Sequence, residues 1–432
     1  MYRRSLIDFL TKNGFQLRNF AFIMTRWILF FIVAGLVEVY AYQAIKTGFE
    51  NKWVHRIYII ISIIALLFLV YSFSRFDRSS GQNQQTLITL GLMLLIYVPK
   101  LMLSLFLAIE DLFRLGIGAY QYFADTNSNS QFLPERRRFI SQVSLAVAAI
   151  PFSSFLYGMV KGRYNYKVLK STVYFNDLPD AFDGFKVLQL SDIHSGSFDN
   201  PDKIKYGIDL INEQDFDLLV FTGDMVNTLA SEMDNWVDVF REIKTPEFGK
   251  FSVLGNQDYG DYAHWDTEED RANNFEGIKA IHPKIGFELL LNENKRLERG
   301  NDSIHLVGVE NWGKRFKKAG DLKKASTGLS PEDFKILLSH DPSHWDYEVR
   351  ESPMNYHLTL SGHTHGMQFG IEIPGFLKWS PVQYVYRFWA GLYENSGRFL
   401  YVNRGFGYHA YPGRVGIWPE ITLIELKKRV NS

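Results

Sequence analysis

Aspartate, asparagine and histidine side chains follow five short apolar runs in the second half of the chain. The runs read FKVLQLSDIH, DLLVFTGD, KFSVLGNQD, FKILLSHD and YHLTLSGHTH. Oxygen and imidazole ligands in this mixture suit Mn²⁺, iron or Zn²⁺. The candidate metal ligands are Asp192, His194, Asp224, Asn256, His340, His363 and His365.

The spacing of these residues supports a shared site. Asp192 and His194 are two residues apart, so an extended chain turns both to the same side, and the GHTH run repeats this spacing. Glycine precedes Asp224, Asn256 and His363, and glycine lets the backbone turn sharply close to an ion. Seven ligands exceed what one such ion takes; they suit two ions ~3.5–4 Å apart with one bridging carboxylate. Two such ions lower the pKa of a shared water and clamp a phosphate.

The apolar runs are expected to be β-strands that position these side chains. They are short and consist mostly of Val, Leu, Ile and Phe, which is typical of strands buried on both faces. Helical patterns lie between some of them, at Ile204–Asn212 and Trp236–Ile243. Alternating strands and helices predict an α/β sheet, and ligands bind such sheets at the carboxyl ends of the strands.

The composition restricts the class of protein. The 47 Lys and Arg residues balance the 47 Asp and Glu residues, so there is no basic excess of the kind that marks nucleic-acid binding. Cysteine is absent, which excludes disulfides and thiolate metal sites. The aromatic content of 16% suits a membrane protein with interfacial Trp and Tyr.

Four apolar stretches in the amino-terminal part are each near the ~20 residues that cross a bilayer core. They are Phe22–Tyr42, Trp53–Phe73, Leu87–Ile109 and Phe139–Val160. Pro99 and Lys100 predict a kink or an interruption in the third. The alternative is a buried helical bundle, but the second stretch lacks the polar stripe of a soluble helix. We therefore expect a membrane segment of about four transmembrane helices at 1–160, a linker at 161–184 and a catalytic domain at 185–430.

Basic residues give conflicting indications about orientation. One group precedes the first span and favours a cytoplasmic amino terminus, which would leave the catalytic domain in the cytoplasm. The run RRRFI before the fourth span also prefers the cytoplasm, and it resembles a twin-arginine export signal, which would place the domain outside. The side of the membrane therefore stays open. The first group comprises Arg3, Arg4, Lys12 and Arg18.

The series DxH, GDxxN, GNxD, a lone His and GHxH resembles the calcineurin-like metallophosphoesterases, from Phe185 to Leu426. The ending VNRGFGYHAYPGRVGIWPEITLIEL is similar to the bacterial membrane-associated branch of that family, which makes the bacterial inner membrane the expected location. The resemblance implies an α/β fold, a four-layer α/β/β/α sandwich, preceded here by the transmembrane segment. It further implies that a bridging hydroxide attacks phosphorus in line, without a covalent intermediate. The implied ligands of one ion are Asp192, His194, His365 and the bridging Asp224, and those of the second add Asn256, His340 and His363.

Two positions depart from the family pattern. Gln257 stands where the family usually has a His near the leaving group, and Gln cannot transfer a proton at a useful pKa. Either the leaving group needs no protonation, as in a pyrophosphate bond, or the enzyme is slow. Met367 replaces a frequent Gly and adds bulk near the site. The predicted catalytic residues are Asp224, Asn256, Gln257 and Asp258; Asp258 is also, with Asn227, a candidate for orienting the metal ligands.

Other residues near the carboxyl end have less certain roles. Arg404 and Arg414 could bind phosphate, although a surface or salt-bridge role is favoured, and His409 is left unassigned. The aromatic-rich stretch Phe376–Leu392 could contact lipid or an acyl chain, but a hairpin that packs its aromatic residues in the core is preferred.

The leading interpretation is a membrane-anchored, metal-dependent phosphoric ester hydrolase. Its substrate would carry a phosphate ester or pyrophosphate bond. The anchor and Gln257 favour a lipid-linked substrate such as a phospholipid, and UDP-2,3-diacylglucosamine hydrolases of the family resemble this arrangement. The alternative is a degenerate metal-binding sensor or scaffold, which Gln257 supports and the complete ligand set opposes. A transporter is disfavoured because the spans are few and poor in paired charges. The identity of the metals and the oligomeric state stay open.

Overall fold

The computed structural model describes residues 28–75, 81–123, 134–373 and 375–429. Its contacts divide the chain into two compact units. Unit 1 comprises residues 1–71 and 92–153, and unit 2 comprises residues 72–91 and 154–432. The start of the first predicted span and the basic residues Arg3, Arg4, Lys12 and Arg18 lie outside the described residues.

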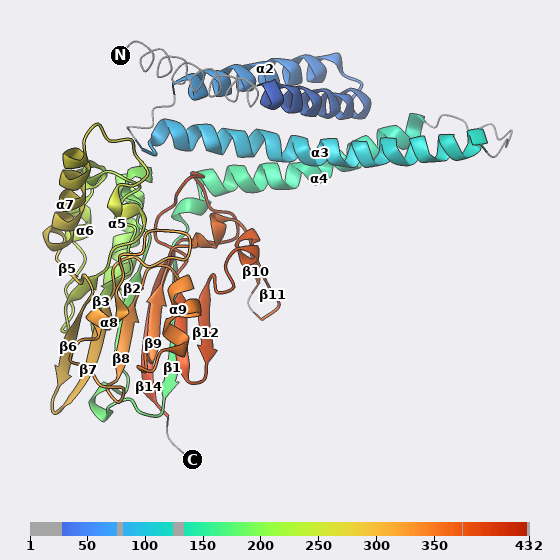
Figure 1. Cartoon of the computed structure of the whole chain (residues 1–432). Helices are drawn as coiled ribbons and strands as arrows, with labels where there is room; N and C mark the ends of the chain where they lie inside the picture. The colour runs from blue at the N-terminus through green and yellow to red at the C-terminus, as the bar shows by residue number, and fades with distance from the viewer. Residues whose placement is uncertain (1–27, 76–80, 124–133, 374, 430–432) are drawn as a thin grey trace, which may run out of the picture. The chain divides into compact units, whose positions relative to one another are not determined.

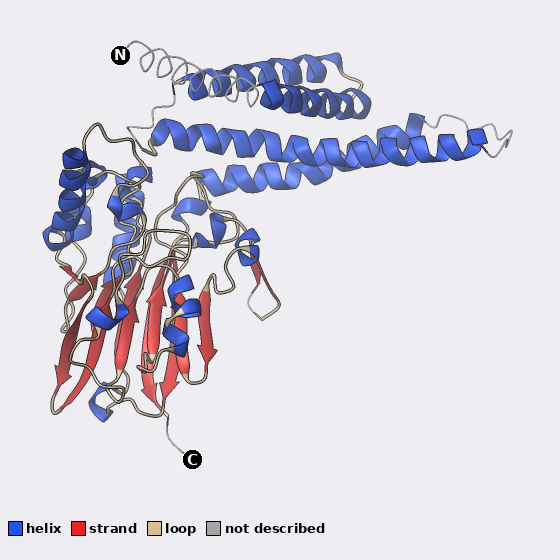
Figure 2. Cartoon of the chain, viewed as in Figure 1, coloured by secondary structure: helices blue, strands red, loops and turns tan. Residues whose placement is uncertain are grey.

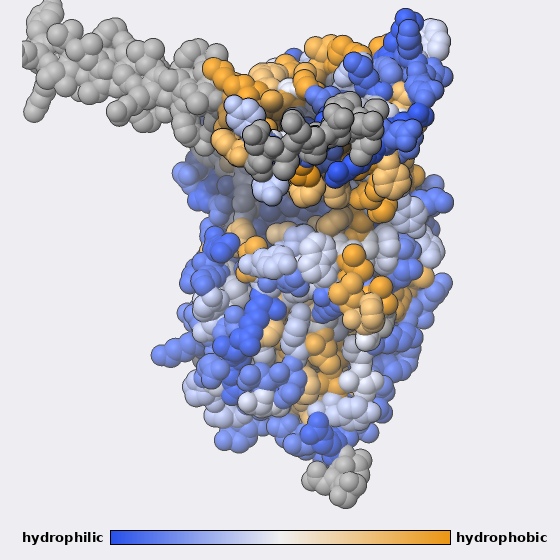
Figure 3. All heavy atoms as spheres, turned by 90° about the vertical axis from the view of Figure 1, so that its right-hand side faces the viewer, coloured by the Kyte–Doolittle hydropathy of each residue, from blue (hydrophilic) through white to orange (hydrophobic). Residues whose placement is uncertain are grey.

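Four helices of the described residues are long and apolar enough to cross a membrane. Side chains such as Ile60, Ile64 and Leu67, exposed by 55%, 61% and 63%, fit helices that face lipid. Figure 3 shows many apolar side chains, with polar ones among them, over the helical part of the chain. The helices are Ile28–Gly48, α2 (Lys52–Ser74), α3 (Gln84–Phe123) and α4 (Pro134–Val160).

The interruption expected at Pro99 and Lys100 does not occur, because α3 is continuous over 40 residues. Lys100 is buried, and its amine bonds to Glu38 Oε1 at 2.6 Å and to Ser62 Oγ at 2.8 Å. Neighbouring helices therefore supply the partners that a charge inside a membrane protein needs. The sequence prediction that the spans are poor in paired charges overlooked this pair.

Unit 2 contains two six-stranded sheets (Figure 1). In the first sheet the order is β1 (Lys167–Phe175), β14 (Glu420–Lys428), β2 (Lys186–Leu190), β3 (Leu218–Phe221), β4 (Lys250–Ser252) and β5 (Glu288–Leu289). In the second sheet it is β12 (Gly391–Asn395), β13 (Arg398–Val402), β9 (Leu358–Ser361), β8 (Lys335–Leu338), β7 (Asp302–Gly308) and β6 (Glu293–Arg299). A separate hairpin consists of β10 (Ile371–Ile373) and β11 (Leu377–Trp379).

The sheets pack face to face and carry helices on their outer faces (Figure 2), which confirms the four-layer α/β/β/α prediction. Val187 and Val220 of the first sheet meet Ile336 and Leu360 of the second in one apolar cluster. The first sheet is covered by α5 (Pro201–Asn212), α6 (Val237–Arg241) and α7 (Glu268–Lys284). The second is covered by α8 (Leu322–Ala325) and α9 (Ser343–Tyr347).

Helix α5 shows how the sequence produces this packing. Asn200 caps its first turn by accepting a hydrogen bond from the Lys203 amide at 3.1 Å, and Pro201 follows as the first helical residue. Ile204, Ile208 and other apolar side chains recur at helical spacing and are buried against the first sheet.

The predicted linker at 161–184 contains the edge strand β1 rather than a simple connection. β1 pairs in parallel with β14, from Lys167 opposite Glu420 to Phe175 opposite Lys428. Only Val173 and Phe175 of this strand are buried, although Val168 packs partly buried against the core. An edge strand with so few fully buried residues lacks the continuous apolar run of an inner strand.

Candidate metal centre

The candidate ligands follow the carboxyl ends of β2, β3, β4, β8 and β9, as the sequence predicts. β2, β3 and β4 are parallel neighbours in one sheet, and β8 and β9 are parallel neighbours in the other. Because parallel strands end at the same edge, their terminal residues meet there. Two groups of three buried or half-buried side chains form at this edge, each with ligand atoms within 4.8 Å of one another.

The first cluster consists of Asp192, His194 and His365. The Nε2 atoms of the two histidines are 3.0 Å apart, and His365 Nε2 is 3.2 Å from Asp192 Oδ1. Two ring nitrogens and a carboxylate oxygen thus converge on one point. This is the donor set that a divalent cation of borderline character prefers.

The second cluster consists of Asp224, His340 and His363. His340 Nε2 is 3.1 Å from Asp224 Oδ2 and 3.3 Å from His363 Nδ1. The same Asp224 oxygen is 3.7 Å from His194 Nε2 of the first cluster. Asp224 therefore lies between the clusters, in the place of a bridging carboxylate.

Hydrogen bonds set which ring nitrogens face the clusters. His340 Nδ1 is 2.7 Å from the Thr222 carbonyl, which only accepts, so Nδ1 carries the proton and Nε2 is free to bind a cation. His194 Nδ1 is 3.1 Å from Asn227 Oδ1, which orients that ring in the same way. Asn227 thus has the position of an orienting partner.

The predicted amide ligand also fits a cation. Asn256 Oδ1 is buried without a hydrogen-bond partner, whereas its Nδ2 donates to the Tyr262 hydroxyl at 2.9 Å. A buried oxygen without a partner costs free energy unless something else occupies it. The next residue, Gln257, donates its backbone N–H to Asp224 Oδ1 at 2.8 Å, which ties this loop to the second cluster.

Five of the candidate ligands have left-handed backbone conformations. Their φ angles are 52° for Asp192, 49° for His194, 61° for Asp224, 71° for His363 and 49° for His365. Such conformations are uncommon outside glycine, cost on the order of 1–3 kcal/mol each and cluster at functional sites. These left-handed residues turn the chain just after each strand ends.

Electrostatics prepare the side chains for a cation. Burial and the neighbouring His409 lower the pKa of His194, and burial lowers the pKa of His363, so both rings stay neutral. Burial alone would lower the pKa of His340, but the Asp224 carboxylate raises it to about 10. A cation held here would therefore displace a proton from His340.

Asp258 faces backbone rather than the ligand atoms. Its carboxylate accepts hydrogen bonds from the amides of Asp224 at 2.9 Å, Met225 at 2.8 Å and Gly255 at 2.9 Å. Burial and the Asp224 charge raise the pKa of Asp258 to about 7. Asp258 thus shapes the two ligand-bearing loops, which suits its predicted orienting role better than a catalytic one.

Two residues near the carboxyl end, Arg414 and His409, contact the first cluster. Arg414 is fully buried and donates to the carbonyl of Gly405 and to His365 Nδ1, both at 3.1 Å. The His409 ring stacks on His194 with centroids 4.6 Å apart. The sequence analysis named both residues but did not predict these contacts: it favoured a surface or salt-bridge role for Arg414 and left His409 unassigned. Arg404, by contrast, forms the favoured salt bridges, to Glu420 at 2.5 Å and Glu372 at 2.6 Å.

A groove of about 580 Å³ leads to the clusters from within unit 2, and we call it the site groove. Asn227, Gln257 and His409 line its inner part. Thr86 and Leu90, from the first turns of α3, line its outer part. Gln257 Oε1 is buried there without a partner.

The aromatic-rich stretch divides between the two predicted roles. Trp389 is buried, and Phe388 packs against Trp345 with centroids 5.0 Å apart. Phe376 and Tyr384, by contrast, are 82% and 78% exposed. Figure 3 shows apolar side chains on the face of unit 2 that carries β10 and β11. We call the exposed apolar residues of this hairpin the apolar hairpin; they are Ile371, Ile373, Phe376 and Leu377.

Met367 is 47% exposed and also has a left-handed φ of 48°. Its predicted effect on access to the site stays a prediction.

Two family models match the two parts of the chain. Residues 185–367 match the family model described as Calcineurin-like phosphoesterase. Residues 25–163 match the one described as Probable Calcineurin-like phosphoesterase, transmembrane domain.

Curated relatives carry corresponding descriptions. A zebrafish transmembrane protein with metallophosphoesterase domain is 29% identical over 68% of this chain and 63% of its own length. The uncharacterized metallophosphoesterase YkuE of Bacillus subtilis is 29% identical over 68% of this chain and 97% of its own. The uncharacterized metallophosphoesterase Cj0846 of Campylobacter jejuni is 25% identical over 92% of this chain and 96% of its own. The match therefore spans less than two thirds of the zebrafish protein and nearly all of the two bacterial ones.

Proposed function

Because this chain belongs to the calcineurin-like phosphoesterases through residues 185–367, we propose that it is a membrane-anchored, dinuclear metal-dependent phosphoesterase. The proposed reaction is hydrolysis of a phosphate ester or pyrophosphate bond. The observation that carries the proposal is the position of Asp224, whose Oδ2 lies 3.1 Å from His340 of one cluster and 3.7 Å from His194 of the other.

Two divalent cations, when bound, supply an activated water and neutralise the charge of the phosphate. The nitrogen and oxygen donors favour manganese, iron or zinc. The chain itself holds the donors in place. His363 donates its backbone N–H to both oxygens of Asp192 at 3.0 Å, so the last strand of the site fixes a ligand on the first.

Gln257 supports a leaving group that departs without a proton. Its side-chain N–H can donate a hydrogen bond but cannot transfer a proton at a useful pKa. The side chain lines the site groove, where it can hydrogen-bond to a leaving oxygen. A pyrophosphate bond, whose leaving group is a stable phosphate anion, suits this residue better than an alkyl ester.

The site groove and the apolar hairpin favour a lipid-linked substrate, with phospholipids as one class. Leu90 and Thr86 of the groove belong to α3, the helix that continues as a membrane span. Within unit 2, Phe369 precedes the hairpin and stacks on Phe155 near the end of α4, with centroids 5.5 Å apart. The groove therefore includes Thr86 and Leu90 near the start of one span, and the hairpin follows a residue that contacts Phe155 near the end of another. Its bacterial relatives make the bacterial inner membrane the proposed location.

The proposal is tested on the full chain, purified in detergent and reconstituted with metal. Release of product is followed from an aryl phosphate diester and from a lipid-linked pyrophosphate, with and without Mn²⁺. We expect metal-dependent turnover that Asp224→Asn abolishes and that Asp234→Asn, at an exposed acid nearby, leaves unchanged.

Metal analysis accompanies the assay. The absence of turnover on both substrates, with two metals bound per chain, would favour the alternative of a metal-binding sensor or scaffold coupled to the spans. Unchanged metal content and turnover in Asp224→Asn would contradict the proposed site itself.

A further inference from the structure

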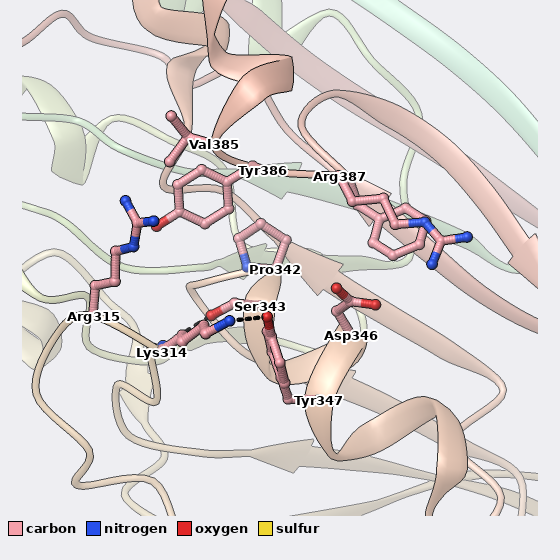
Figure 4. A pocket seen from close by; sticks show the side chains of 10 residues that line it. Lys314, Arg315, Pro342, Ser343, Asp346, Tyr347, Val385, Tyr386 and Arg387 are labelled. Carbon is pink, nitrogen blue, oxygen red and sulfur yellow. Dashed lines mark hydrogen bonds between the residues drawn. The ribbon is translucent and has the colours of Figure 1, made fainter.

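A pocket of about 160 Å³ in unit 2 is lined by three basic side chains, Lys314, Arg315 and Arg387 (Figure 4). Tyr386 forms part of its wall, between the two arginines along the rim. The site groove and this pocket share no lining residue.

The pocket adjoins the second cluster through His363. The Tyr386 hydroxyl is 2.8 Å from His363 Nε2, and the Phe316 ring contacts the His363 ring with centroids 4.8 Å apart. Arg315 directly precedes Phe316, and Arg387 directly follows Tyr386. Each arginine is thus adjacent in the chain to an aromatic residue that contacts this candidate ligand.

Three basic side chains and one acidic side chain line the pocket, so the formal charge of its lining is positive. Neither Arg315 nor Arg387 is within 4.0 Å of a carboxylate among the residues that the structure describes, and both are exposed. Lys314 bonds to the hydroxyl of Tyr347 instead of an acid (Figure 4). The acid in the lining, Asp346, lies 3.5 Å from Arg350.

Other arginines of the same unit behave differently. Arg271 and Arg299 are partly exposed, yet both pair with aspartates, at 3.1 Å and 2.7 Å. Like charges placed together repel, and an anion relieves that repulsion. Guanidinium groups bind phosphate oxygens in a planar, bidentate way that suits this role.

We propose that this pocket is a second anion subsite, which binds a phosphate group of the substrate other than the one that is hydrolysed. The inference rests on the proposed function and deepens it, since it selects substrates with two phosphates in tandem over simple esters. In a pyrophosphate-linked substrate, the phosphate attacked lies at the clusters and its neighbour contacts Arg315 beside Tyr386.

Binding of inorganic pyrophosphate and of inorganic phosphate tests the subsite on the metal-loaded full chain in detergent. Titration calorimetry with excess metal compares the wild type with R315Q/R387Q. We expect pyrophosphate to bind the wild type about 10- to 100-fold more tightly than phosphate, as charge-assisted hydrogen bonds of this kind do. The double variant should lose most of that difference and keep its affinity for phosphate.

The matched control is R241Q/R296Q, which removes two exposed arginines elsewhere in unit 2. Equal pyrophosphate affinity in R315Q/R387Q and the wild type would overturn the inference. The same holds if the substitutions weaken only the binding of phosphatidic acid micelles, which would assign the pocket to a lipid headgroup.

The two proposals can fail separately. Hydrolysis of the aryl diester with unchanged pyrophosphate binding in R315Q/R387Q would leave the proposed function standing and remove the subsite. Selective loss of pyrophosphate binding, in a chain that hydrolyses neither substrate, would support the anion subsite without the proposed reaction.

Discussion

The two candidate metal clusters are neighbours, since Asp224 of the second lies 3.7 Å from His194 of the first, but they differ in their surroundings. Around the first, polar and charged groups close in: Asn227 holds His194, and buried Arg414 contacts His365. The second meets aromatic rings and an open, basic pocket through His363. All three residues of the first cluster are buried, whereas His363 of the second is half-buried. We therefore expect the first cluster to hold an ion more firmly than the second.

Among the variants that separate the two clusters, the largest effect is expected from Asp192→Asn, which removes the carboxylate of the first cluster only. We expect one metal per chain to be lost and turnover to fall about 10³-fold, because a cation contributes several kcal/mol to the transition state. Elemental analysis and initial rates measure both. Asp224→Asn should weaken both metals instead. If the two variants lost the same metal in the same proportion, the clusters would not be distinct.

A smaller effect, an increase in turnover, is expected from Gln257→His, which restores a proton donor in the site groove. Turnover of an alkyl phosphate ester should rise by up to about 10²-fold, the lower end of the range for general acid catalysis. Turnover of a pyrophosphate bond should change little, since its leaving group needs no proton. Parallel rate measurements on the two substrates separate these outcomes. An equal rise on both substrates would show that Gln257 does not act at the leaving group.

Asn227→Ala tests the surroundings of the first cluster, and Tyr386→Phe tests those of the second. Each removes one hydrogen bond to a candidate ligand, at 3.1 Å to His194 and 2.8 Å to His363. Loss of such a partner costs about 10- to 100-fold in metal affinity. We expect Asn227→Ala to weaken one step of a metal titration and Tyr386→Phe the other. Weakening of the same step by both would contradict the assignment of the clusters.

The smallest effect on turnover is expected from substitution of Glu232, which supports the loop that carries Asn227, the partner of His194 in the first cluster. Its carboxylate accepts the backbone N–H groups of Asn227 at 2.6 Å, Thr228 at 3.0 Å and Leu229 at 2.9 Å. Burial raises its pKa from 4.5 to about 7. The folded state therefore binds this proton more tightly, and the stabilisation is complete below pH 4.5 and disappears as the pH rises to about 7.

The contribution of this proton to the free energy of unfolding is at most about 3.5 kcal/mol, at about 1.4 kcal/mol per pKa unit. Thermal unfolding of Glu232→Gln should lose this pH dependence, whereas Glu269→Gln, at an exposed acid of α7, should keep it. An unchanged pH profile in Glu232→Gln would show that the carboxylate titrates normally.

The sequence predicts the strand-end residues because buried parallel strands are recognisable and must end at one edge. It could not predict the left-handed φ angles of Asp192 or His363, since the conformation depends on contacts across two sheets. The pairing of Lys100 with Glu38 joins residues far apart in the chain, and no local pattern announces it. β1 was predicted as part of a linker because a partly exposed edge strand lacks an apolar pattern.

The position of β14 in the first sheet has a consequence for biosynthesis. β14 lies between β1, which follows the fourth span in the chain, and β2. The ribosome delivers β14 after every other described strand, so β1 has no partner until then. Glu420, at the start of β14, also holds Arg404, next to the Gly405 backbone that contacts Arg414. We therefore expect the spans to enter the membrane while unit 2 is still incomplete, so that the metal site is assembled only after the protein is anchored.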